Sequence, residues 1–178
     1  TVGITPCEQA SYPALLLHCA NCQLVQLGLI VDPQILFPKE YPYTSGTTKI
    51  LRDNFADLYQ ECKTIIDIGK KDLIVDIGSN DGTLLSNFLG YHRVQGITPE
   101  DIGMLAIKKG IPTIQSYFNR DVVDEIIKKE GKAKIITATN VFAHIENIHE
   151  IGNCILELLE DDGVFISESH YFLGLIET

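Results

Sequence analysis

The stretch that decides the fold runs from residue 73 to residue 85 and reads Leu-Ile-Val-Asp-Ile-Gly-Ser-Asn-Asp-Gly-Thr-Leu-Leu. Its first five residues are the short apolar run of a buried parallel strand. The glycines that follow, Gly78 and Gly82, permit a tight turn and a close approach of the backbone to a ligand. The pattern predicts a strand, a glycine loop and the start of a helix, which is the ligand-binding turn of an α/β fold.

Two carboxylates, Asp76 and Asp81, lie in or beside this loop. The glycine spacing is Gly-x-x-x-Gly rather than the Gly-x-Gly-x-x-Gly of dinucleotide binders. A phosphate among unpaired carboxylates would meet like-charge repulsion on the order of several kcal/mol, whereas a cation would not. S-adenosylmethionine carries a sulfonium and an ammonium, and its carboxylate could bind free N–H groups at the helix start. The loop therefore favours this cofactor over a pyrophosphate, and the alternative is an ordinary turn without a ligand.

The composition is that of an acidic globular protein. The chain has 178 residues, of which 45% are hydrophobic, and a net charge of −10. Without a basic stripe, neither nucleic acid nor an anionic membrane surface is an expected partner. The sequence contains no run of eighteen apolar residues and no basic leader, so a cytoplasmic location is expected. Five cysteines, an odd number, fit a reducing compartment better than a disulfide framework.

The chain is expected to divide into three parts. Residues 1–48 hold five of the seven prolines and predict a small irregular N-terminal module. Apolar residues recur at helical spacing from about 50 to 68, so residues 49–70 are expected to form a linking helix. Residues 71–178 are expected to form the main domain.

Strands and helices alternate along the main domain. The strands are expected at 73–77, 93–97, 113–116, 134–139 and 164–168. The helices are expected at about 82–89, 101–109, 120–129 and 148–160. Five strands joined by helical crossovers predict a Rossmann-like, doubly wound parallel sheet.

Five segments of the chain, taken in order, carry a family likeness. They are Tyr12-Pro-Ala-Leu-Leu-Leu-His-Cys-Ala-Asn-Cys-Gln-Leu-Val-Gln-Leu27, Tyr41-Pro-Tyr-Thr-Ser-Gly46, the glycine loop, Asn140-Val-Phe-Ala-His-Ile145 and Ser167-Glu-Ser-His-Tyr171. Together they resemble the sugar C-methyltransferases of deoxysugar biosynthesis. The resemblance implies an N-terminal zinc-binding domain, a central class I S-adenosylmethionine domain and a C-terminal domain. It also implies methylation of the carbon beside a ketone on a nucleotide-linked deoxysugar, which makes a nucleotide sugar the expected partner.

The resemblance also implies that the main domain is incomplete. Such a fold normally closes its sheet with two further strands, and this sequence stops just after the fifth. An uncovered apolar sheet edge would be an aggregation liability. The chain is therefore interpreted as a fragment, with an unusually short natural chain as the alternative.

Cys19-x-x-Cys22 looks like the second half of the four-cysteine zinc site of this family. A structural zinc site needs four ligands, and the first cysteine pair of the family is absent from this sequence. Cys7 and His18 are the nearest other donors. Because a half-site binds zinc poorly, two free thiols in a loop are the alternative.

The cofactor positions implied by the resemblance lie at the carboxyl ends of the strands. They are Asp76, Gly78, Asn80, Asp81, Thr98, Tyr117, Phe118 and Asn140.

Thr98 departs from the pattern of such enzymes. They usually place an acid there, which grips both ribose hydroxyls. Ribose binding is therefore expected to be weaker or to recruit Glu100 or Asp101. Tyr117 and Phe118 are expected to pack on the adenine, with a role as core aromatics as the alternative.

Methylation of carbon beside a ketone needs a base, donors that stabilise the enolate, and a sulfonium in line with the carbanion. In the family the strongest base candidate lies in a Tyr-His-Glu-His segment that this sequence does not contain. The remaining candidates are His170, Tyr41 and Tyr43, for substrate binding or proton handling. His144 matches a family position, but a helix cap or packing residue is the simpler interpretation.

Two other functions are compatible with the sequence. One is an O- or N-methyltransferase of a small metabolite with the same fold. The other is a non-catalytic binding module, which Thr98 and the missing base would suit. For this chain we expect cofactor binding before turnover, because residues 73–85 could hold the methyl donor whereas most of the groups expected to use it are not in this sequence.

Overall fold

The computed structural model describes residues 11–171, 174 and 177. The chain forms two compact units, residues 1–36 and residues 37–178. The boundary thus lies before the one expected at 48/49. Among the described residues, no helix has the length and apolar character needed to cross a membrane.

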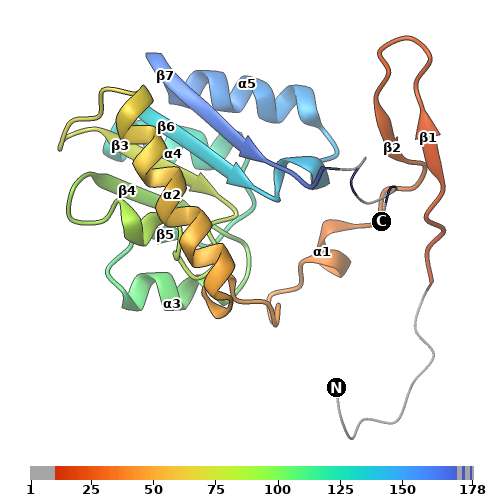
Figure 1. Ribbon diagram of the computed structural model, residues 1–178, viewed down its shortest axis with the longest axis horizontal. Coiled ribbons are helices and arrows are strands. Elements are labelled where there is room, and N and C mark those ends of the chain that lie inside the picture. The colour runs from red at the N-terminus through yellow and green to blue at the C-terminus, as the bar shows by residue number, and fades with distance from the viewer. Residues whose placement is uncertain (1–10, 172–173, 175–176, 178) are drawn as a thin grey trace, which may run out of the picture. The chain divides into compact units, whose positions relative to one another are not determined.

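The larger unit is built on a five-stranded sheet in the order β5-β4-β3-β6-β7 (Figure 1). All neighbouring strands are parallel, which confirms the predicted doubly wound sheet. The order of the strands reverses between β3 and β6, and ligands of such folds bind beyond the carboxyl ends of the strands at this point. The strands are β3 (Leu73–Ile77), β4 (Arg93–Ile97), β5 (Thr113–Ile114), β6 (Ala133–Thr139) and β7 (Leu159–Glu168).

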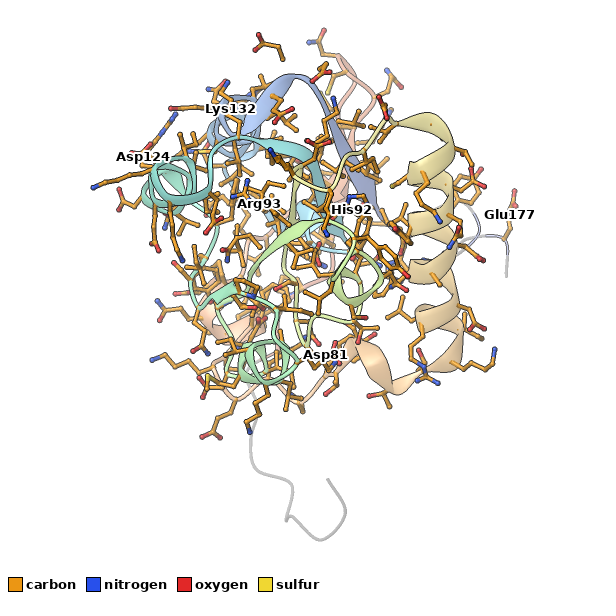
Figure 2. The ribbon with its side chains drawn as sticks, turned by 90° about the vertical axis from the view of Figure 1, so that its left-hand side faces the viewer. Asp81, His92, Arg93, Asp124, Lys132 and Glu177 are labelled. Atoms are coloured by element: carbon orange, nitrogen blue, oxygen red, sulfur yellow. The ribbon has the colours of Figure 1, made fainter. Side chains whose placement is uncertain are left out.

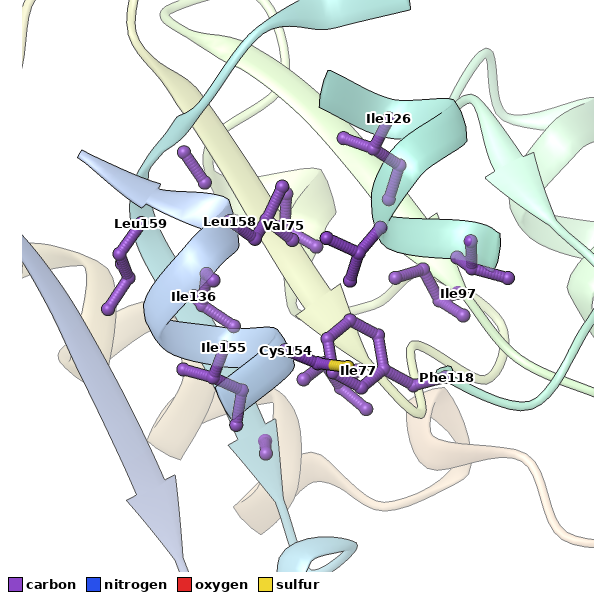
Figure 3. Close-up of a cluster of buried hydrophobic side chains, with 14 of the residues drawn as sticks. Val75, Ile77, Ile97, Phe118, Ile126, Ile136, Cys154, Ile155, Leu158 and Leu159 are labelled. Atoms are coloured by element: carbon purple, nitrogen blue, oxygen red, sulfur yellow. The ribbon is translucent and has the colours of Figure 1, made fainter. Parts of the chain in front are cut away.

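Strand β3 is buried on both faces, as its apolar run predicts. Val75 and Ile77 belong to a core cluster that also contains Ile126 of helix α4 (Arg120–Glu130) and Ile155 of helix α5 (Ile148–Leu158) (Figure 3). Ile74 points the other way, into a second cluster. Successive side chains of a strand alternate between faces, so one short strand anchors both halves of the core.

Helix α2 (Lys49–Ile65) covers the second face and is not a linker. Its buried residues, Phe55, Tyr59 and Cys62, recur at helical spacing and pack in the cluster of Ile74. The tyrosine ring meets the ring of Phe88 edge-on, with centroids 4.7 Å apart. The helix is therefore part of the core of the larger unit.

The helix predicted at 82–89 is wrong. Only Leu85–Asn87 (η2) forms a short 3₁₀ turn there. The side chain of Ser86 donates to the carbonyl of Thr83, and Asn87 donates to the carbonyls of Thr83 and Leu84. Short polar side chains of this kind compete with the backbone for its hydrogen bonds and so interrupt a regular helix.

The other helices follow the prediction closely. Helix α3 (Gly103–Lys108) lies between β4 and β5. Asn119 caps α4 by accepting from the N–H of Val122, and Asn147 caps α5 by accepting from the N–H of Glu150. The last strand, β7, begins at Leu159 rather than at 164.

The smaller unit contains a two-stranded antiparallel hairpin. Strand β1 (Leu16–His18) pairs with β2 (Val25–Leu27), and a short helix α1 (Pro33–Leu36) follows. The two cysteines of the Cys-x-x-Cys motif lie in the turn of this hairpin, and both are exposed.

Candidate functional site

The glycine loop is fixed to the neighbouring strand by two hydrogen bonds. The N–H groups of Gly78 and Ser79 both donate to the carbonyl of Ile97, across 2.8 and 3.0 Å. Gly78 has a φ of +75°, and a Cβ there would lie 2.3 Å from Cγ2 of Val141. The glycine predicted from the sequence is thus required, because both its conformation and the loop after β6 exclude a side chain.

Ser79 has a buried hydroxyl that no other described residue satisfies. Its Oγ occupies the space left by the absent side chain of Gly96, where a Cβ would lie 2.5 Å from it. Gly96 is the register partner of Asp76 on β4. The sequence analysis missed this residue because a serine in a loop carries no signal of burial.

Asp76 is a buried carboxylate at the point where the strand order reverses. Only 2% of its surface is exposed, and its Oδ1 accepts a hydrogen bond from Oγ1 of Thr137 across 2.7 Å. Burial raises the pKa of Asp76 to about 7, although the hydrogen bond from Thr137 acts in the opposite direction. A cationic ligand beside this buried carboxyl group would stabilise its ionised form.

Asp81, the second acid of the loop, is already neutralised. Its Oδ2 lies 3.1 Å from Nζ of Lys109, which also donates to its carbonyl oxygen. Its Oδ1 accepts from the N–H and the hydroxyl of Thr83. Figure 2 shows Asp81 well apart from Arg93, the first residue of β4, and from His92, which precedes that strand. The two acids that looked equivalent in the sequence therefore differ: Asp81 pairs with Lys109, whereas Asp76 has no cationic partner among the described residues.

The side chain of Asn80 hydrogen-bonds to the segment that precedes α2. Its Oδ1 accepts from the N–H of Ser45 across 2.9 Å, and its Nδ2 donates to the carbonyl of Tyr43 across 3.1 Å. This arrangement brings Tyr43 to the glycine loop. The same two bonds occupy the carboxamide of Asn80, which the sequence analysis expected to bind the cofactor.

A further buried acid, Glu100, lies just beyond the end of β4. The hydroxyl of Thr98 donates to the carboxylate of Glu100, and both side chains are buried, with 1% and 7% of their surface exposed. Asp101 is exposed. Of the two acids expected to replace the missing ribose contact, Glu100 is the one held beside Thr98.

The two aromatic candidates after β5 separate in the structure. Phe118 is 9% exposed and lies in the core cluster of β3, so little of its ring is open to an adenine. Tyr117 is 40% exposed, and its hydroxyl donates to the carbonyl of Phe37. The alternative role as a core aromatic therefore holds for Phe118 and not for Tyr117.

Asn140 follows β6 with a φ of +56°. Its N–H donates to the carbonyl of Glu168, and its Nδ2 donates to Oε1 of the same residue across 2.9 Å. The other carboxylate oxygen of Glu168 accepts from Asn54 of α2 across 2.8 Å. Glu168 is thus a site residue that the sequence analysis missed, and its place at the end of β7 was the available signal.

The catalytic candidates do not form one cluster. Tyr41 lies edge-on between Phe37 and Tyr43, with ring centroids 5.8 and 6.4 Å away. Phe37 also meets His144 edge-on at 5.5 Å, as expected for a packing residue. His170 follows β7 and is exposed. The structure therefore brings the backbone of Tyr43 to the glycine loop, with the ring of Tyr41 beside that of Tyr43. No hydrogen bond or ring contact among the described residues joins His170 to the two tyrosines.

The cysteine motif supplies two metal donors. Hydrogen bonds from the backbone of Cys22 and Asn21 lower the pKa of the Cys19 thiol. His18 is engaged with Gln23, at 2.9 Å from Nε2 to Oε1. Within residues 11–171, 174 and 177, no group of three or more His, Cys, Asp or Glu side chains could hold a metal. These donors do not complete a structural zinc site, Cys7 lies outside the described residues, and zinc binding stays a prediction.

The comparison with known proteins agrees with the fold. The chain is 31% identical over 168 residues to the C-methyltransferase NovU of Streptomyces niveus, a match that covers 93% of this chain. The chain spans 40% of the length of that relative.

Two solved structures show the same fold at low sequence identity. The plantazolicin methyltransferase BpumL in complex with SAH has a TM-score of 0.52 and 19% identity, over 68% of this chain and 48% of that chain. The precorrin-6y C5,15-methyltransferase from Geobacter metallireducens has a TM-score of 0.50 and 11% identity, over 83% and 76%.

The family itself is given by the match of a methyltransferase domain to residues 48–172. This region contains α2, the glycine loop and the whole parallel sheet. The chain belongs to the methyltransferase domain family.

Proposed function

We propose that this chain is part of an S-adenosylmethionine-dependent methyltransferase that methylates carbon beside a ketone of a nucleotide-linked deoxysugar. The observation that carries the cofactor assignment is the buried carboxylate of Asp76, which the described residues pair with a hydroxyl and not with a cation. The C-methyltransferase at 31% identity supports the reaction, and the resemblance of the five segments supports the sugar.

Three groups would hold the cofactor. Asp76 would face its ammonium directly or through water, because a positive charge there offsets the burial of the carboxylate. Glu100 would bind the ribose hydroxyls in place of the usual acid, with Thr98 orienting its carboxylate. Tyr117 would pack on the adenine. When bound, S-adenosylmethionine supplies an electrophilic methyl group.

The tyrosines beside the glycine loop would act on the substrate. A phenol donates a hydrogen bond to the oxygen of a developing enolate, and Tyr41 and Tyr43 supply two phenols whose rings lie edge-on to each other. His170 would bind the substrate or move its proton, as its position after the fifth strand suggests.

Calorimetric titration of S-adenosylmethionine into the chain tests the cofactor assignment. We expect binding that Asp76→Asn weakens by about tenfold to a hundredfold, the value of one charged hydrogen bond. Asp53→Asn is the matched control, because Asp53 is an exposed acid on α2 and should leave the affinity unchanged. Absence of heat and of thermal stabilisation at millimolar cofactor would overturn the assignment.

Product analysis tests the chemistry of the acceptor. The chain is incubated with S-adenosylmethionine and a nucleotide-linked keto-deoxysugar, and the product is examined by mass spectrometry and proton NMR. A methyl group on carbon beside the ketone supports C-methylation. A methyl group on oxygen or nitrogen would replace the proposed reaction with the alternative considered from the sequence.

A further inference from the structure

Residues 41–46, which we call the tyrosine arm, lie against the glycine loop although the two segments are far apart in the sequence. Two hydrogen bonds join them, and both involve the side chain of Asn80. Beyond these bonds, a Cβ on Gly46 would lie 2.6 Å from Oγ1 of Thr83 and 2.7 Å from Oδ2 of Asp81. The arm and the loop are therefore in close contact.

The carboxamide of Asn80 is well matched to this contact. It is 7% exposed and offers one acceptor and one donor. The arm presents a complementary pair, the N–H of Ser45 and the carbonyl of Tyr43. A carboxylate or a hydroxyl of similar size could not satisfy both partners in the same way. The residue is also in a left-handed conformation, with a φ of +50°, which asparagine tolerates better than most residues.

Other residues hold the end of the arm and the backbone that precedes and follows it. Arg52 donates to the carbonyl of Gly46, the last residue of the arm, and to that of Thr47, across 2.6 and 3.2 Å. On the other side of the arm, the N–H of Asp101 donates to the carbonyl of Lys39. These contacts flank the tyrosines. The middle of the arm, from Tyr43 to Ser45, is held by Asn80.

We propose that Asn80 is a positioning residue that fastens the tyrosine arm to the glycine loop, so that order in the cofactor loop and placement of Tyr43 are coupled. Its role is to join the two halves of the site. The two hydrogen bonds of Asn80 to the arm do not depend on the proposed function. Only the importance of these bonds for catalysis rests on the proposed function. Coupling of this kind is reciprocal, so a ligand that orders the loop also orders the arm.

Hydrogen exchange at the amide of Ser45 measures the fastening directly, because this N–H donates to Asn80. Asn80→Gly removes the carboxamide and retains a residue that adopts positive φ without strain. We expect exchange at Ser45 to become at least tenfold faster. Asn80→Asp keeps the acceptor for Ser45 but loses the donor to Tyr43, so it should leave the protection of Ser45 below that of the natural chain. Asn87→Ala is the matched control, because that amide bonds only within its own turn among the described contacts, and it should leave Ser45 unchanged.

A second variant approaches the contact from the arm. Gly46→Ala places a methyl group against Thr83 and Asp81 without altering Asn80, and it should also expose the amide of Ser45. It keeps the proposal testable if Asn80→Gly does not fold. The amides of Ile74 and Val75 in the buried strand report whether each variant is folded.

The same samples separate this proposal from the proposed function. Added S-adenosylmethionine should slow exchange at Ser45 in the natural sequence and not in Asn80→Gly. If the natural chain binds no cofactor, the proposed function fails, while faster exchange in Asn80→Gly without ligand still supports the fastening. Unchanged exchange at Ser45 in Asn80→Gly, or full protection of Ser45 in Asn80→Asp, would overturn the proposed pairing of the carboxamide with both partners. Loss of cofactor affinity with Ser45 still protected would instead make Asn80 a direct contact.

Discussion

Thr137 donates a hydrogen bond to Asp76 across 2.7 Å, from the strand that lies on the other side of the point where the sheet order reverses. Both side chains are buried, and they are register partners on β3 and β6. The bond gives the carboxylate one partner in a region of low polarity. Its pKa nevertheless stays near 7, because the loss of water outweighs one neutral hydrogen bond.

The first prediction concerns pH and stability. The pKa of Asp76 is about 7 in the folded chain and 3.8 for an ordinary aspartate, so the folded state binds the proton more tightly. The contribution of Asp76 to stability is therefore greatest below pH 4, falls between about pH 4 and 7, and is level above pH 7. Asp76→Asn should remove this slope and raise the free energy of unfolding at pH 8 by about 1–3 kcal/mol.

Urea unfolding of the natural chain and of the variant at pH 5, 6, 7 and 8 measures this difference. Asp53→Asn serves as the control, since its carboxylate is exposed. The hydrogen bond from Lys134 lowers the pKa of Asp162 below 3.8. The contribution of Asp162 to stability is therefore lost only at a pH below the range measured here, and it does not affect the comparison. If the free energy of unfolding depends on pH in the same way for the natural chain and for Asp76→Asn, the raised pKa of Asp76 is contradicted.

The second prediction compares two glycines with similar backbone conformations. Gly78 and Gly90 have φ values of +75° and +87°, but only Gly78 faces a neighbour, Val141, at 2.3 Å from the Cβ it would carry. Gly90→Ala should reduce the free energy of unfolding by about 1–2 kcal/mol, from its conformation alone. Gly78→Ala should cost more. Thermal unfolding of both variants gives the difference, and equal losses would show that Val141 yields freely.

The third prediction tests the acid beside Thr98. Glu100→Gln should weaken the binding of S-adenosylmethionine by about tenfold to a hundredfold, because a charged acceptor for the ribose hydroxyls is lost. Asp101→Asn, at the exposed neighbouring acid, should leave the affinity within about twofold. Calorimetry measures both. The assignment fails if the exposed residue has the larger effect.

The fourth prediction concerns the buried hydroxyl of Ser79. Since no described residue satisfies it, Ser79→Ala should raise the free energy of unfolding by about 1 kcal/mol. Ser86→Ala is the control in the same segment, because its hydroxyl donates to Thr83 across 2.7 Å and should not stabilise the chain when removed. Chemical denaturation resolves the two cases. A loss of stability in Ser79→Ala would indicate that this hydroxyl has a partner such as a bound water.

The sheet could be predicted because its signals are local. The run from Leu73 to Ile77 carries its own evidence of burial, and the alternation of strands and helices leaves few topologies. The helix expected at 82–89 failed where short polar side chains bind the backbone. The spacing of hydrophobic residues gives no sign that side chains compete for the hydrogen bonds of the backbone.

The site was less predictable because its contacts are distant in the sequence. Asn80 bonds to residues that precede it by 35 and 37 positions, and Glu168 bonds to a residue 114 positions away. The same holds for α2: its apolar face indicates that the helix packs, but not which residues it packs against. The sequence indicated which polar residues gather at the edge, while their pairing needed the fold.

Gly96 and Ser79 share one small volume between two strands. The side chain that can be accommodated at one of these positions therefore depends on the side chain at the other. A methyl group at 96 would require the side chain at 79 to shrink or turn away. Across relatives of this chain the two positions should therefore covary, with bulk appearing at one only where it disappears at the other.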